Sequence, residues 1–193
     1  MQVKIEDTFE HPVRLAFVQN LFKAGTVNGE GEPAYSVTAI IPRDHPAIAE
    51  LEAAEDEVAK AKWGTKAAAT VKTLRAAGKT TVKDGDTKTN YDGFEGNAFV
   101  SMRAKQNQKP NVYTSRGEAI GDDGTVYSGC YAHVICSVWA QENGYGKRLN
   151  AQVTGVKFTR DGDSFGGGAS PATADDFADL SAADEGSDAS LLS

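Results

Sequence analysis

The stretch NAFVSMRAK, residues 97–105, decides the fold because its side chains alternate in character along its length. Successive side chains of a β-strand point to opposite faces. One face would carry small and apolar side chains suited to a barrel interior, from Ala98, Val100, Met102 and Ala104. The other would carry an aromatic ring, a hydroxyl and two cations, from Phe99, Ser101, Arg103 and Lys105.

Similar patterns recur on both sides of this strand. Alternating or β-branched runs predict strands over residues 13–18, 35–41, 110–113, 126–141 and 149–160. Gly155 is expected to mark a bulge or bend in the last of them. We therefore predict a mainly β, β-rich α+β protein built on a small five-stranded barrel.

A helical insertion interrupts the strands. Asp44 is a suitable N-cap for a first helix, and Gly64 a suitable residue just past its end. Thr65 can cap a second, shorter helix that runs through Ala77 and is followed by Gly78.

Charge is unevenly distributed along the chain. The net charge is −7, but residues 166–193 hold six acids and no Lys or Arg, which leaves −1 for residues 1–165. Residues 60–109 hold eleven basic and four acidic residues. The overall acidity therefore hides a basic middle segment.

Aromatic rings are interleaved with these cations, a combination that suits single-stranded nucleic acid. Cations neutralise phosphates, and flat rings stack on unpaired bases. The candidate stacking residues are Trp63, Tyr91, Phe94, Phe99 and Tyr113. The candidate phosphate contacts are Lys72, Arg75, Lys79, Lys83, Arg103, Lys105 and Lys109, to which Lys147 and Arg148 of a hairpin turn could add. The alternative is that Phe99 belongs to the core and the cations only aid solubility.

The run 126–141 has a small-residue face that includes Cys130 and Cys136, which we expect to be buried thiols. Its other face carries Tyr127, Tyr131 and Trp139. These rings could stack on bases, pack beneath the helical insertion or form the contact of a homodimer. We expect His133, on the same face, to be structural.

From residue 162 onward the composition changes to Gly, Ala, Ser and acids, with too few apolar residues to form a core. We predict a flexible tail that competes with DNA for the basic groove and binds partner proteins. Its candidate partner-binding residues are Asp175, Asp176, Phe177, Asp179, Leu180, Asp184, Glu185 and Asp188.

Nothing in the sequence favours catalysis. Asp84 with Asp86, or Asp122 with Asp123, could bind Mg²⁺ in a nuclease, but each pair lies in a glycine-containing turn where Asp is common. No phosphate-loop, zinc-protease or nucleophile-elbow motif is present. We predict a protein that is not an enzyme and needs no cofactor or metal. No apolar run in the sequence is long enough for a membrane span, and because residues 1–10 are polar and mixed in charge we expect no signal peptide.

Several motifs together resemble the single-stranded-DNA-binding proteins of tailed phages, a group long known only as a phage domain of unknown function. They are IPRDHP (41–46), KWG (62–64), KDGD (83–86), YDGFEG (91–96), VYSGCY (126–131), NAQVTGV (150–156) and RDG (160–162). The element YSGCY is the most specific of them. The resemblance implies an OB-fold, binding with little sequence preference, and a role in phage replication or recombination in the host cytoplasm. It also implies an acidic tail that contacts a polymerase or helicase, although this chain finishes on two leucines and a serine where such tails often finish on an aromatic residue.

We accordingly expect an OB-fold DNA-binding domain over residues 1–165 and a flexible acidic tail over 166–193. The competing hypothesis from another class is a non-catalytic interaction or assembly factor whose OB-like barrel binds protein.

Overall fold

Five strands close into a barrel in the computed structural model, which describes residues 1–27 and 29–166. The strands are β2 (Arg14–Ala16), β4 (Glu30–Ile41), β6 (Ala98–Lys105), β9 (Gly146–Arg160) and β8 (Tyr131–Asn143). Each pairs with the next, and β8 pairs back with β2. The β6–β9 pair is parallel and the other four are antiparallel. This closed arrangement confirms the predicted five-stranded OB-type barrel.

Four short strands extend the barrel. β1 (Gln2–Ile5) pairs with β8, β3 (Gly25–Val27) with β4, β5 (Val82–Asp84) with β6, and β7 (Asn111–Tyr113) with β9. The sequence analysis missed β1, β3 and β5, because strands of three or four residues are too short to show a period. Two short 3-10 helices, η1 (Val18–Asn20) and η3 (Gly85–Thr87), lie in the connections.

The barrel interior follows the alternation predicted from residues 97–105. Val100 and Met102 are fully buried, whereas Ser101, Arg103 and Lys105 on the other face are exposed. Phe99 also lies on the outer face but is covered by other residues. Cys130 and Cys136 are buried free thiols, as expected.

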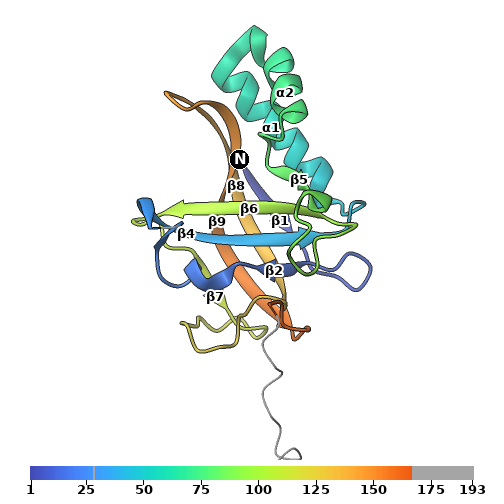
Figure 1. The fold of residues 1–193 in the computed structure, drawn as a ribbon, viewed down its shortest axis with the longest axis vertical. Helices are drawn as coiled ribbons and strands as arrows, with labels where there is room; N and C mark the ends of the chain where they lie inside the picture. The colour runs from blue at the N-terminus through green and yellow to red at the C-terminus, as the bar shows by residue number, and fades with distance from the viewer. Residues whose placement is uncertain (28, 167–193) are drawn as a thin grey trace, which may run out of the picture.

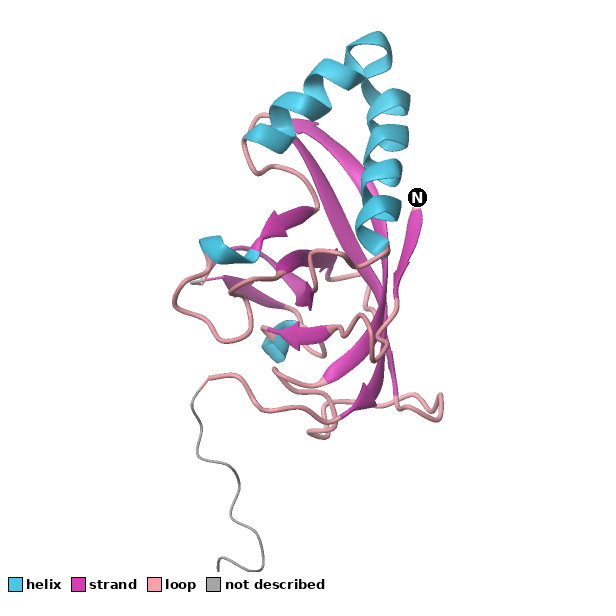
Figure 2. Ribbon diagram, turned by 90° about the vertical axis from the view of Figure 1, so that its right-hand side faces the viewer, coloured by secondary structure: helices cyan, strands magenta, loops and turns pink. Residues whose placement is uncertain are grey.

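The helical insertion packs beside the extended end of the β8–β9 hairpin (Figures 1 and 2), and the first half of α1 joins the main core of the barrel through Ala47, Leu51 and Ala54. It consists of α1 (Ala47–Trp63), a 3-10 turn η2 (Gly64–Lys66) and α2 (Ala67–Ala76). The predicted cap at Asp44 is wrong, because the helix starts later, with Pro46 at the N-cap position. The His45 ring replaces it: Nδ1 accepts a hydrogen bond from the Ala47 N–H at 3.0 Å.

The predicted strand 126–141 begins later than expected, at Tyr131. Gly129, with φ of 112°, turns the chain just before the strand, so Tyr127 lies outside it. The Tyr127 hydroxyl instead donates a hydrogen bond to the Asp161 carboxylate at 3.0 Å. His133 is structural, as predicted, because its Nδ1 accepts the Asp7 N–H at 3.0 Å.

Within the described part of the chain, no helix is long and apolar enough to cross a membrane. The predictions made for the acidic tail, including its partner-binding residues, lie outside the described residues apart from Gly166.

Candidate nucleic-acid interface

The outer face of β4 and β6 is a polar surface next to an aromatic one. Three cross-strand pairs face outward along its polar part: Ala34 with Lys105, Ser36 with Arg103, and Thr38 with Ser101. The hydroxyls of Thr38 and Ser101 are 3.2 Å apart and hydrogen-bonded. The next outward pair, Ile40 with Phe99, begins the aromatic part.

Four aromatic rings pack against one another in succession over this aromatic part, in edge-to-face or tilted pairs, and we call them the ring cluster: Phe99, Phe94, Phe17 and Tyr91. Phe94 lies 5.2 Å from Phe99 and 5.9 Å from Phe17 between ring centroids, and Phe17 lies 5.0 Å from Tyr91. Phe99 and Phe94 are buried, whereas Tyr91 is 52% exposed. The cluster therefore holds Tyr91 from below and presents its ring to solvent.

The loop that carries Tyr91, residues 85–97, is closed at its base by backbone and ionic contacts. The Gly85 N–H donates to the Asn97 carbonyl at 2.9 Å. The Arg43 guanidinium donates to the carboxylates of Asp84 at 2.8 Å and Asp86 at 2.6 Å. A second oxygen of Asp86 accepts the Gly96 N–H at 2.7 Å. The two carboxylates considered above for metal binding thus hold Arg43 and fix this loop.

Two lysines, Lys83 and Lys88, lie beside the ring cluster, and a third cation, Arg148, lies near Lys83. The Nζ of Lys88 lies 5.7 Å from the Tyr91 ring, and the Nζ of Lys83 lies 6.0 Å from the Phe99 ring. Burial lowers the pKa of Lys83, and the nearby charges of Arg148 and Lys88 lower it further. Among the described residues, none of these three cations takes part in an ion pair. An anion would relieve their mutual repulsion.

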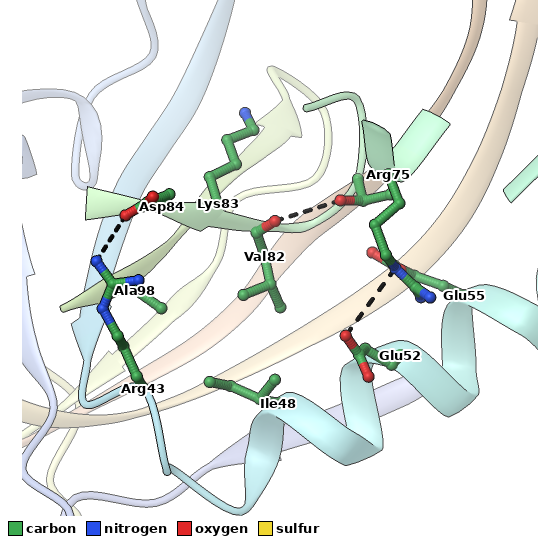
Figure 3. Close-up of a pocket in the computed structure, with 10 residues that line it drawn as sticks. Arg43, Ile48, Glu52, Glu55, Arg75, Val82, Lys83, Asp84 and Ala98 are labelled. Atoms are coloured by element: carbon green, nitrogen blue, oxygen red, sulfur yellow. Dashed lines mark hydrogen bonds and ion pairs between the residues drawn. The ribbon is translucent and has the colours of Figure 1, made fainter. Parts of the chain in front are cut away.

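Two hollows flank this surface. The larger, about 620 Å³, is formed by the loop residues 85–95 and includes Lys88, Asn90 and Tyr91 in its lining. The smaller, about 270 Å³, lies between α1 and β5 and is drawn in Figure 3. Glu52 and Glu55 line it opposite Arg75, so its charges compensate one another and it is less suited to a phosphate (Figure 3).

The structure brings together only part of the residue set predicted from the sequence. The members that lie on or beside the outer face of β5 and β6 are Lys83, Tyr91, Phe94, Phe99, Arg103 and Lys105. Phe94 and Phe99 are 1% and 3% exposed, too little for a base to stack on them in this conformation. Their expected stacking role is corrected to support of Phe17 and Tyr91.

The other predicted residues lie elsewhere. Trp63 belongs to the buried cluster between the helices and the hairpin, and its Nε1–H donates to Glu142 at 2.9 Å. Lys72 and Arg75 lie on α2, and Lys79 follows it. Lys109 lies just before β7, and Tyr113 is the last residue of β7. This strand is at the opposite end of the molecule from the helices (Figure 1).

Two residues of the surface were not in the predicted set. Lys88 stands three positions before Tyr91 in the basic segment, so its neighbourhood was a usable signal. Phe17 gave no signal, because it was assigned to a strand. It instead has φ of 55°, a left-handed conformation that few non-glycine residues adopt.

The chain is similar to phage proteins over almost its whole length. A family model described as "Enterobacter phage Enc34, ssDNA-binding protein" matches residues 2–188. Protein p50 of Acyrthosiphon pisum secondary endosymbiont phage 1 is 34% identical over 189 residues, which cover 96% of this chain and 97% of that protein.

Solved structures show the same architecture. The single-stranded DNA-binding protein of bacteriophage Enc34, in complex with ssDNA, superposes with a TM-score of 0.67 at 28% identity. The match covers 84% of this chain and 88% of that one. The single-stranded DNA-binding protein gp2.5 of bacteriophage T7 gives a TM-score of 0.55 at 17% identity, over 98% and 99% of the two chains. This second likeness concerns the fold alone.

Proposed function

The chain belongs to the phage family of single-stranded-DNA-binding proteins represented by that of Enterobacter phage Enc34, and from this premise we propose that it binds single-stranded DNA without sequence preference and without catalysis. The main support for the proposal is a group of three cations that have no ion pair among the described residues: Lys88, beside the exposed ring of Tyr91, and Lys83 with the neighbouring Arg148. This group borders the barrel face formed by β4 and β6, since Lys83 of β5 pairs with Phe99 of β6. β4 and β6 correspond to the second and third strands of an OB-fold. That face is where OB-folds bind oligonucleotides.

Electrostatic capture supplies the first part of the mechanism. Lys83, Lys88 and Arg148 gain a counter-charge when phosphates arrive, and the strand releases its condensed cations. Arg103 and Lys105 continue the positive surface along β6. Because each phosphate contact adds to the salt dependence, affinity should fall steeply with ionic strength.

Stacking supplies the second part. Tyr91 offers a flat ring to an unpaired base, and Phe17 beneath it fixes the ring's position. Stacking on one ring contributes about 1–3 kcal/mol per base and is tolerant of sequence, because every base has a flat face. The hydroxyls of Thr38 and Ser101 are hydrogen-bonded to each other, which leaves less capacity for reading base edges.

We further propose that the protein serves phage replication or recombination in the host cytoplasm, with residues 1–165 as the DNA-binding domain. The acidic segment 166–193 would compete with DNA and recruit a polymerase or helicase. One contact supports the competition. The Gly166 N–H donates to the Asp92 carboxylate at 3.3 Å, so the acidic segment begins next to Tyr91. A tether anchored at that point keeps a polyanion at high effective concentration near the basic surface.

The direct experiment is a titration of the full chain with a labelled oligo-dT at low and at moderate salt. We expect tight binding at low salt and a loss of affinity that is linear in the logarithm of salt concentration. A chain ending at residue 166 should bind more tightly than the full chain. If neither form binds oligo-dT at low salt, the proposal is wrong and a protein-binding barrel is the better hypothesis.

A further inference from the structure

A band of residues in mutual register continues from the proposed DNA-binding face around the barrel. Its members, each the cross-strand partner of the next, are Lys83, Phe99, Ile40, Arg14, Tyr131 and Arg160. Lys83 and Phe99 belong to the surface described above. The remaining members carry the band across β4, β2, β8 and β9.

Beyond Ile40 the band alternates guanidinium groups with aromatic rings. The Arg14 guanidinium lies 4.2 Å from the centroid of the Phe165 ring and 5.3 Å from that of Tyr131. The Arg160 guanidinium lies 4.0 Å from the Tyr131 ring and 4.9 Å from the Phe9 ring. Phe165 in turn packs on the backbone of Gly93, two residues from Tyr91. A continuous series of contacts thus joins Phe9 to the loop that carries Tyr91.

Phe9 is 92% exposed, and the tight turn that carries it is well held. The Thr8 N–H donates to the His11 carbonyl at 3.1 Å, and the His11 N–H donates to the Thr8 hydroxyl at 2.9 Å. Next to the turn, the buried Asp7 carboxylate accepts hydrogen bonds from the Val13 N–H at 2.9 Å and from Arg160 at 2.6 Å. The turn therefore presents a bare ring at a defined place beside a cation.

We propose that Phe9, with Arg160 behind it, is a second stacking anchor for the same DNA strand that binds at Tyr91. This inference rests on the proposed function and extends it to a longer path around the barrel. A ring beside a guanidinium offers one base a face and one phosphate a charge, the same chemistry as at Tyr91. A protein partner would need a broad apolar patch, but among the described residues the exposed large apolar or aromatic side chains besides Phe9 are few: Met1, Tyr91, Trp139 and Tyr145.

Arg160 already pairs with the Asp7 carboxylate, and the Arg14 guanidinium donates to the backbone carbonyls of Gly129 and Asp163. The Asp7 carboxylate offsets the charge of Arg160, and both guanidinium groups have some of their donors occupied. We therefore expect an anchor that strengthens binding of long strands and has little affinity alone.

The test compares short and long oligo-dT, of about 5 and about 20 nucleotides, since OB-fold sites cover roughly 4–16 nucleotides. Phe9→Ser in the full chain should weaken binding of the long strand about tenfold and leave the short strand unchanged. Phe9→Trp should bind the long strand as tightly as the wild type. Tyr145→Ser is the matched control, because Tyr145 is 94% exposed at the tip of the β8–β9 hairpin, and it should change neither affinity.

The outcomes separate this inference from the proposed function. If the wild type binds both lengths and Phe9→Ser binds them equally well, the second anchor is refuted while strand binding at Tyr91 stands. An equal loss at both lengths would also refute it, since Phe9 would then act on the primary surface or on the fold. If the wild type binds neither length, the proposed function itself fails.

Discussion

The barrel face around Tyr91 and the helical insertion both place lysines near an aromatic residue, but they differ in how far the ring is buried and in whether the cations form ion pairs. In the insertion, Trp63 is 9% exposed and bonded to Glu142, and Arg75 lies within 4.0 Å of two carboxylates. On the barrel face, Tyr91 is 52% exposed, and Lys83 and Lys88 have no ion pair among the described residues. A local count of cations and rings does not distinguish the two regions.

Two properties therefore decide which basic segment is available to a DNA strand: whether its cations form ion pairs, and whether its aromatic ring is exposed. The contacts of Trp63 and Arg75 hold the insertion together, and on this basis we expect the insertion to contribute mainly stability. Within residues 1–27 and 29–166, Lys83 and Lys88 of the barrel face have no carboxylate partner, so we expect them to contact phosphates. Mutations in each region, followed by measurements of both stability and DNA affinity, therefore test this division.

The largest effect is expected for Glu55→Ala in α1. The side chain is 1% exposed, and one oxygen accepts both the N–H and the hydroxyl of Thr81 at 2.6 Å. Leaving these buried donors without an acceptor should lower the free energy of unfolding by about 2–4 kcal/mol, measured by urea denaturation. DNA affinity of the folded variant should stay unchanged.

Glu52→Ala is the control for this variant, because its carboxylate is about half exposed and lies 4.0 Å from Arg75. It should cost under about 1 kcal/mol of stability. A folded Glu55→Ala protein with strongly reduced affinity would place the insertion in the interface and break the division.

The next effect concerns charge. Lys83→Glu with Lys88→Glu should lower oligo-dT affinity about 100-fold at low salt and reduce the slope of log affinity against log salt by about 1.4, or 0.7 per lost contact. Lys72→Glu with Lys79→Glu makes the same charge change on the insertion. We expect it to leave the slope almost unchanged. Equal slope changes from both pairs would show that Lys72 and Lys79, which the sequence analysis also proposed, bind phosphates.

Removing the exposed ring should have a smaller effect. Tyr91→Ala should weaken binding about tenfold through the loss of one stacked base, as measured by fluorescence anisotropy. The salt slope should not change, because no cation is lost. Trp63→Phe tests the corresponding ring of the insertion and should alter affinity less than about twofold. The reverse order of these two variants would contradict the assignment of the interface.

The smallest effect is a pH dependence. Burial and the charges of Arg148 and Lys88 hold the pKa of Lys83 below its usual value in the free protein. A bound phosphate favours the charged amine, so binding takes up a proton at alkaline pH. Affinity should therefore fall a few-fold as the pH rises toward the ordinary lysine pKa. Lys83→Arg should flatten this fall, and an unchanged profile in that variant would argue against a phosphate at this position.

The sequence predicted the parts of the fold that depend on long periodic segments. Residues 97–105 and the small-residue face of β8 determine the barrel interior, and both matched the structure because alternation reports burial directly. The helix start at Asp44 and the strand start at Val126 were wrong. Both boundaries depend on contacts that hydrophobic periodicity does not report. The His45 ring caps Ala47 while it contacts the Glu6 carbonyl, and the turn at Gly129 lies against the backbone of Asp163.

The site was less predictable than the fold. Lys83, Tyr91 and Arg103 were assigned to the binding surface from the mixture of charge and rings alone. The burial of Phe94 and Phe99 depends on Phe17 and on the closure of loop 85–97, which join residues far apart in sequence. Whether a cation is free depends likewise on distant partners, as Arg75 with Glu52 and Glu55 shows.

The position of β9 in the sheet has a consequence for how the protein is made. This strand pairs with β8, β6 and β7, and its pairing with β6 at Ala151 closes the barrel, so the barrel cannot close before β9 has been translated. Until then the nascent chain carries β2, β4 and β6 with open hydrogen-bonding edges, a state prone to aggregation. Closure then joins segments distant in sequence, which favours late and cooperative folding. A ribosome stalled within β9 should accordingly hold a protease-sensitive chain, whereas one released after residue 166 should yield a resistant barrel.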